Sequence, residues 1–197
     1  MAEIVTTGTG KVERIADRAQ LTVAFEASAT TRAEAVGGLN TRLADVEQLV
    51  QAVGVRVASR QLSVNERWER RRRVGSVARQ QYVLVFRDLA QLPDLVGKLA
   101  AIEPATLDGP HWLLAETTDA RREAQAAAVT DARIIAEGYA AAVGAQLGPL
   151  LKLTDEQTHH AMMAAYGGAP AVDVSNLSLE PELVAVTATC VTTWQLL

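Results

Sequence analysis

The chain of 197 residues is long enough to bury a hydrophobic core, and its 49% apolar and 21% charged residues are typical of a globular protein rather than a disordered or fibrous one. The formal net charge of −4 argues against broad electrostatic attraction to nucleic acid or to an anionic membrane, which needs many basic side chains on one face. We expect one cooperative unit, a single domain over residues 1–197.

The single cysteine, Cys190, cannot form an intramolecular disulfide, and this favours a reducing compartment. Residues 1–12 lack the positively charged and long apolar regions of a secretion signal, and no stretch approaches 18 uninterrupted apolar residues. The sequence therefore predicts a cytoplasmic protein with no transmembrane segment, unless a leader was removed ahead of residue 1.

Local patterns predict the first three elements. Alternating apolar residues indicate two strands within residues 3–29. Thr31 and Glu34 have the spacing of a capping box, in which the hydroxyl and the carboxylate satisfy free amides at a helix start. A helix should run from there to Gly54, which supplies the left-handed residue that commonly ends a helix.

The middle of the chain predicts a hairpin of two long strands over residues 55–72 and 74–88, joined near an arginine cluster by a turn containing Gly75. Apolar residues on both faces at 82–86 indicate a central strand covered on each side. A short helix over 92–102 should follow.

The C-terminal part predicts a strand, a long helix and two further strands. After a strand over 107–116, the helix should begin at Asp119, its expected cap, and end at Gly144, and its many alanines permit close packing against a sheet. Strands are expected over 147–155 and 183–197. Between them, residues 157–180 predict a long loop, ordered or disordered, of a length that is uncommon unless functional.

The predicted order of elements is ββα-ββα-β-α-ββ. Its hairpins and uneven helix spacing favour an α+β fold with a mixed or antiparallel sheet and helices packed on one face, rather than a doubly wound parallel sheet.

Three stretches of the chain resemble the SIMPL domain family. They are Gly8-Thr9-Gly10-Lys11-Val12 with Asp17-Arg18-Ala19, then Thr31 with Glu34-Ala35 and Asn40, and then the alanine-rich helix that runs into Gly144-Ala145-Gln146-Leu147-Gly148. The chain departs from the family at Ala16, where many members have proline, and in lacking the export signal of many bacterial members. The resemblance implies an α+β fold and, in some members, large ring-like or channel-like homo-oligomers, and it supplies no catalytic residues.

The most unusual local feature is residues 66–73, which hold five arginines and two glutamates around one tryptophan. Such a segment can pair with phosphates and stack on bases. It is more often a solvated hairpin end that prevents aggregation, or a contact with acidic residues of another subunit. The candidate interaction surface comprises Arg67, Trp68, Arg70, Arg71, Arg72 and Arg73.

Other polar features give no catalytic, cofactor or metal site. His159 and His160 are adjacent on a loop, which is poorly arranged for chelation. His111 has no Ser or Cys nucleophile motif to accompany it, so a hydrolase is only a third possibility. Gly8 to Gly10 lack the third glycine and the following helix of a dinucleotide fingerprint, and Cys190 should be inert core.

We therefore expect no enzyme activity and no cofactor. The leading hypothesis is a self-assembling scaffold or interaction protein, a homo-oligomer with a further protein partner as an option. The alternative is a binding module whose 67–73 hairpin contacts a phosphate-bearing or nucleic-acid partner, although the acidic chain argues against nucleic acid.

Overall fold

The computed structural model describes residues 2–52, 55–156 and 179–197. Backbone contacts divide these residues into two compact units. The first unit contains residues 2–16, 114–156 and 182–197, and the second contains 17–52, 55–113 and 179–181. Whether the two units unfold in one transition, as expected of a single cooperative domain, stays a prediction.

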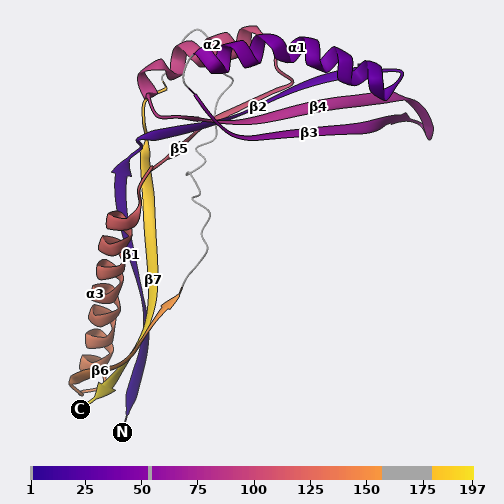
Figure 1. The fold of residues 1–197 in the computed structure, drawn as a ribbon. Coiled ribbons are helices and arrows are strands. Elements are labelled where there is room, and N and C mark those ends of the chain that lie inside the picture. The colour runs from indigo at the N-terminus through magenta and orange to yellow at the C-terminus, as the bar shows by residue number, and fades with distance from the viewer. Residues whose placement is uncertain (1, 53–54, 157–178) are drawn as a thin grey trace. The chain divides into compact units, whose positions relative to one another are not determined.

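The first unit is a three-stranded antiparallel sheet with a long helix on one face (Figure 1). The strand order is β1-β7-β6, so β1 and β6 are the edges among the described strands. The elements are β1 (Glu3–Ile15), α3 (Thr118–Ala142), β6 (Leu147–Glu156) and β7 (Leu183–Leu196).

The contact between α3 and β1 is made by very small residues. Every fourth residue of α3 is a buried alanine, from Ala120 to Ala140. Opposite this stripe lie Gly8 and Gly10 of β1, where an added Cβ would overlap the carbonyl oxygens of Ala128 and Ala124 respectively. The helix backbone therefore passes directly over the strand, and glycine is required because no side chain fits between them.

A buried hydrogen-bonded network continues this contact. Thr6 Oγ1 donates to the carbonyl oxygen of Ala132 at 2.8 Å and lies 2.9 Å from Thr192 Oγ1, which accepts from Trp194 Nε1 at 2.8 Å. Buried polar groups are costly unless they are paired, and here each hydroxyl has a partner. The network joins α3 to β1 and β7 at one register.

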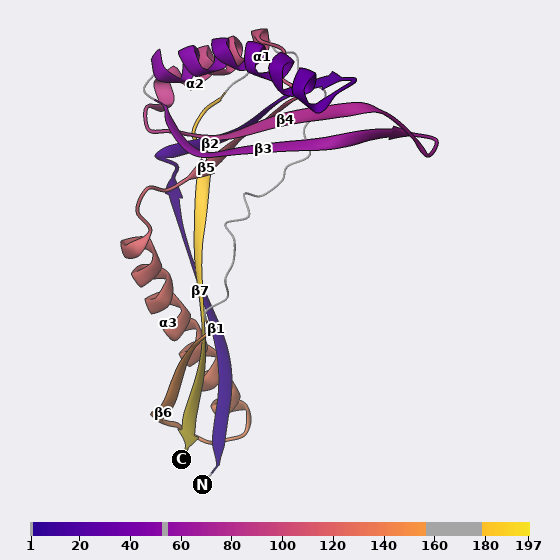
Figure 2. The same cartoon turned by 45° about the vertical axis from the view of Figure 1, so that its right-hand side comes forward.

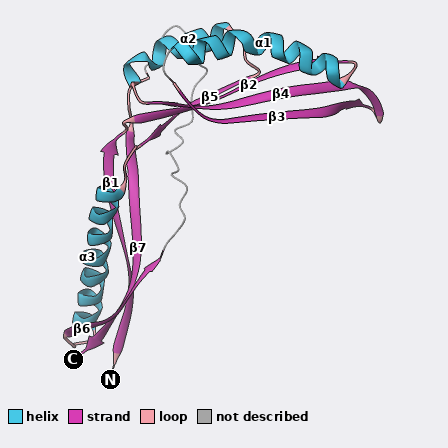
Figure 3. Ribbon diagram, viewed as in Figure 1, coloured by secondary structure: helices cyan, strands magenta, loops and turns pink. Residues whose placement is uncertain are grey.

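The second unit is a four-stranded antiparallel sheet of order β3-β4-β2-β5. Helices α1 and α2 lie on one face of it in both views (Figures 1 and 2), and Figure 3 separates helices from strands by colour. The elements are β2 (Arg18–Ala29), α1 (Arg32–Ala52), β3 (Arg56–Glu69), β4 (Arg72–Phe86), a short 3₁₀ turn (Leu89–Gln91), α2 (Leu92–Ala101) and β5 (Thr106–Leu113).

The predicted capping box at the start of α1 is confirmed. The amide of Glu34 donates to Thr31 Oγ1 at 3.2 Å, and the amide of Thr31 donates to Glu34 Oε2 at 3.1 Å. Two amides that the helix leaves without backbone partners are thereby satisfied. The predicted terminator, Gly54, lies outside the described residues.

Glu47 of α1 joins the helix to the sheet. It accepts a hydrogen bond from Tyr82 Oη at 2.9 Å and two from the guanidinium of Arg60 at 3.2 and 2.9 Å. Burial, together with the hydrogen bond to Glu47 and the negative charge of Glu47, raises the pKa of Tyr82 to about 12. The phenol therefore stays protonated and keeps donating well above neutral pH.

Strand β4 is central in the sheet, but only one of its faces is fully buried. Tyr82, Leu84 and Phe86 are buried on the helix side, whereas Val83 and Val85 on the other face are only half-buried. Among the described residues, the prediction that residues 82–86 are covered on both faces is confirmed for the helix side only. An antiparallel sheet can leave one face to solvent, which a run of apolar residues does not reveal.

The α+β class and the order of elements are confirmed, with three corrections. The strands form two antiparallel sheets rather than one. Helix α3 begins at Thr118 after Thr117, so Asp119 lies in its first turn instead of capping it. Gly75 lies within β4 rather than in the hairpin turn. Glycine is required there because an added Cβ would overlap the carbonyl oxygen of Ala29.

Replacing Gly8 or Gly10 by alanine should lower the free energy of unfolding by about 3 kcal/mol or more, because α3 must move away from the sheet and expose its alanine stripe. Urea unfolding followed by circular dichroism measures this. Gly138→Ala is the matched control: Gly138 lies in the same helix with nothing near its added Cβ, and should gain roughly 0.5–1 kcal/mol. Equal effects at Gly8 and Gly138 would contradict the close contact.

Candidate functional site

The β3–β4 hairpin brings together the six residues predicted as an interaction surface. We call residues 66–73, at the closed end of this hairpin, the arginine tip. The strands are joined by the two-residue turn Arg70-Arg71, whose φ angles are 43° and 71°. Positive φ at both residues is typical of a type I′ turn, in which Asn-Gly is favoured and larger residues are strained. Arginine has no conformational advantage at either position.

The arginine tip carries a formal charge of +3 within a chain of net charge −4. Two of its arginines are in ion pairs: Arg67 lies 3.2 Å from Glu69, and Arg73 lies 3.6 Å from Glu66. Glu66 also contacts Arg32 of α1 at 3.3 Å.

The other three arginines of the tip differ from these two. In the part of the chain that the structure describes, Arg70, Arg71 and Arg72 are exposed and make no ion pair within 4.0 Å. The positive charge is therefore concentrated at the turn itself.

Trp68 adds an exposed aromatic surface to the arginine tip. Its side chain is 58% exposed, and its cross-strand partner is Arg73, with an irregularity in the register between Arg67 and Trp68. Cross-strand partners lie on the same face of a sheet with Cβ atoms about 4.5–5.5 Å apart. One face of the tip thus presents an indole ring next to a cation.

This arrangement suits recognition of anions rather than catalysis. A guanidinium offers a fork of donors that binds a phosphate or a carboxylate through two hydrogen bonds. The ion pairs within the tip are exposed, and such pairs contribute little to stability. The arginine tip is therefore suited to binding a phosphate or a carboxylate.

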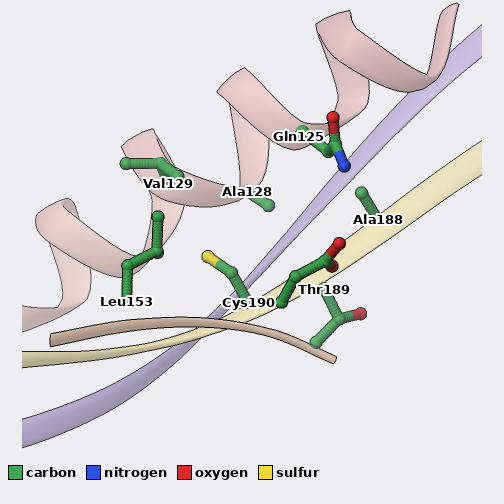
Figure 4. A pocket seen from close by; sticks show the side chains of 8 residues that line it. Gln125, Ala128, Val129, Leu153, Ala188, Thr189 and Cys190 are labelled. Carbon is green, nitrogen blue, oxygen red and sulfur yellow. The ribbon is translucent and has the colours of Figure 1, made fainter. Parts of the chain in front are cut away.

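A second feature, which the sequence did not predict, is a pocket of about 220 Å³ in the first unit (Figure 4). It lies between α3 and strands β6 and β7, and the sulfur of Cys190 points into it. The small side chains of Ala128 and Ala188 leave this space open. Its lining residues are Gln125, Ala128, Val129, Leu153, Asp155, Ala188, Thr189 and Cys190.

Cys190 is buried, with 6% of its surface exposed. Burial raises the pKa of its thiol, the amide of Gly8 opposes this, and the nearby charges of Asp155 and Asp131 raise the pKa further. A thiol with a raised pKa is a weak nucleophile at neutral pH. The prediction that Cys190 lies in the core is confirmed by this burial.

The remaining sequence candidates do not gather into a site. His111 lies on β5 with Nε2 3.0 Å from Asp108 Oδ2, and no hydroxyl or thiol nucleophile bonds to it within the described ranges. His159 and His160 lie outside those ranges, as does most of the predicted 157–180 loop. Gly8 and Gly10 serve helix packing rather than nucleotide binding. No group of three or more potential metal-ligating residues is found among the described residues.

The two antiparallel sheets, each with helices on one face, define an α+β protein with no recognisable catalytic constellation in its described part. The chain belongs to the SIMPL family, described as a protein of unknown function (DUF541), whose model matches residues 4–194. No curated protein matches the chain. None of the described helices combines the length and the apolar character needed to cross a membrane.

Replacing the turn by Arg70→Asn with Arg71→Gly should raise the free energy of unfolding by roughly 1–2 kcal/mol, because both new residues accept a positive φ. Thermal unfolding monitored by circular dichroism measures the gain. Arg70→Gln with Arg71→Gln removes the same charges but keeps the strain. If the Gln pair stabilises as much as Asn-Gly, charge repulsion rather than turn conformation limits the hairpin.

The thiol of Cys190 should react with a disulfide reagent far more slowly in the folded protein than in urea, by a factor of about a hundred or more. A raised pKa lowers the thiolate fraction at any given pH, so the folded-state rate should still be rising at pH values where an ordinary cysteine has reached its plateau. Absorbance of the released thiol measures both rates. A folded rate equal to the unfolded rate would show that the pocket does not shield the sulfur.

Proposed function

We propose that this protein is a non-enzymatic, self-assembling protein whose copies join through strand β6. The observation that supports this most is the exposed edge formed by β6. Leu150, Leu151 and Leu153 are 41%, 50% and 51% exposed on a strand that pairs with β7 on one side only among the described strands. Exposed apolar edge strands are templates for pairing with another chain, and monomeric proteins avoid them.

The sequence of β6 favours pairing with β6 of a second copy in antiparallel orientation. In such a pair the helix-covered faces of the two sheets lie on the same side only if the two-fold axis passes through a residue rather than between two residues. An axis through Lys152 or Asp155 places like charges directly opposite each other, which is unfavourable. An axis through Thr154 places Lys152 of each copy opposite Glu156 of the other, which gives two attractive pairs.

This pairing would extend the three-stranded sheet of the first unit into a six-stranded one across two copies. With the axis at Thr154, residues 152–156 of β6 pair between the two copies, and Pro149, which cannot donate a backbone hydrogen bond, lies outside this pairing. The two-fold axis is perpendicular to the sheet and keeps α3 on the same face in both copies. In this register Leu153 of each copy lies opposite Asp155 of the other, so the second β6 strand would cover part of the exposed leucine surface.

A second candidate function is a binding module that uses the arginine tip to contact a phosphate-bearing partner. One observation favours it: Arg70 and Arg71 occupy strained positions where smaller residues would fold more easily. This function does not exclude self-assembly, since it involves the second unit and β6 belongs to the first.

Light scattering at low and moderate salt tests self-assembly. The wild-type chain should form a discrete dimer or larger oligomer, and Leu151→Glu with Leu153→Glu should reduce it to a monomer because the charges repel across the pair. Ile134→Glu with Val143→Glu is the matched control, since both residues are exposed and apolar at α3 rather than on β6. A wild-type monomer at high concentration would refute the proposal.

A further inference from the structure

We infer that the arginine tip is a binding site for linked phosphate groups, the chemistry shared by a polyphosphate chain and a single-stranded nucleic acid backbone. The inference goes beyond self-assembly and rests on the second candidate function. It concerns Arg70, Arg71 and Arg72 as the groups that contact phosphate, with Trp68 beside them.

The conformation of the turn does not explain why its two residues are arginines. At φ values of 43° and 71° each residue is in the left-handed region, where a non-glycine residue costs of the order of 1–2 kcal/mol. Local strain of this kind is typically retained where the side chain has a role. Asn-Gly would form the same turn without either guanidinium.

The glutamates of the tip separate its arginines into two sets. Glu66 and Glu69 engage Arg73 and Arg67, which lie on the strands. The three consecutive residues Arg70 to Arg72 make no ion pair among the described residues, although the rest of the chain is rich in carboxylates. A ligand with several closely spaced negative charges matches three adjacent cations better than isolated carboxylates do.

The compactness of this cluster limits the class of ligand. A protein that follows a long duplex needs an extended basic face, and the net charge of −4 argues against one. A short run of linked phosphates needs only a few guanidinium groups within a small area. The exposed indole of Trp68 adds a surface on which a base can stack if the phosphates belong to a nucleic acid.

Fluorescence anisotropy with labelled inorganic polyphosphate and a labelled oligothymidylate tests the site in the full chain. Arg70→Asn with Arg71→Gly should weaken binding of at least one probe tenfold or more. It should also reduce the slope of log affinity against log salt by roughly 1.5, since each phosphate contact contributes about 0.7–0.9. The hairpin remains folded in this variant because its turn residues suit a type I′ conformation.

Arg121→Gln with Arg122→Gln is the matched control, since it removes two exposed charges from α3 and should leave affinity and salt slope unchanged. The inference is overturned if this control weakens binding as much as the tip variant, if the tip variant binds like wild type, or if wild type binds neither probe.

Two further measurements identify the source of the phosphates and separate this site from self-assembly. If bases stack on Trp68, Trp68→Leu should weaken binding of the oligonucleotide but not binding of polyphosphate. Unchanged affinity for both probes indicates a polyphosphate-type ligand. Light scattering of the tip variant should give the wild-type mass. If its mass falls while its polyphosphate affinity is unchanged, the arginine tip is a subunit contact, which overturns this inference and leaves self-assembly standing.

Discussion

The first unit depends on the close approach of α3 to β1, which Gly8 and Gly10 permit opposite the alanine stripe. A helix with small side chains is about 10 Å wide, whereas neighbouring strands are about 4.8 Å apart, so such a helix covers two strands. Helix α3 covers strands β1 and β7, and it covers little of β6. The exposed leucines of β6 and the pocket beside Cys190 both follow from this one contact.

Local chemistry made several elements predictable from the sequence. The capping box at Thr31 and Glu34 involves residues three apart, so its geometry is set once a helix begins there. The hairpin was predictable because its two strands are adjacent in the sequence. Its turn was misplaced because Gly75 was interpreted by its conformational freedom, whereas the structure uses it for the close approach of Ala29. A glycine in sequence does not distinguish these two requirements.

The partition into two sheets and the pocket were not predictable, because both depend on partners that are distant in sequence. Alternation shows that a strand has one buried face, but it does not show which strand or helix covers that face. Strand β1 pairs with β7 across the whole length of the chain, and only this pairing places Cys190 opposite Gly8. The alanine spacing of α3 was the available signal for close packing. The sequence did not show that Gly8 and Gly10 are the residues on which this helix packs.

The two surfaces proposed for function are places where the chain departs from rules that the rest of it follows. Most of the fold is locally consistent, with caps, alternation and small residues where packing needs them. The turn of β3 and β4 carries arginines where glycine and asparagine fold more easily, and β6 exposes leucines on an edge. Neither departure stabilises the isolated chain. Such inconsistencies in natural sequences are concentrated at functional sites, and for this reason we propose both surfaces as places where a partner binds.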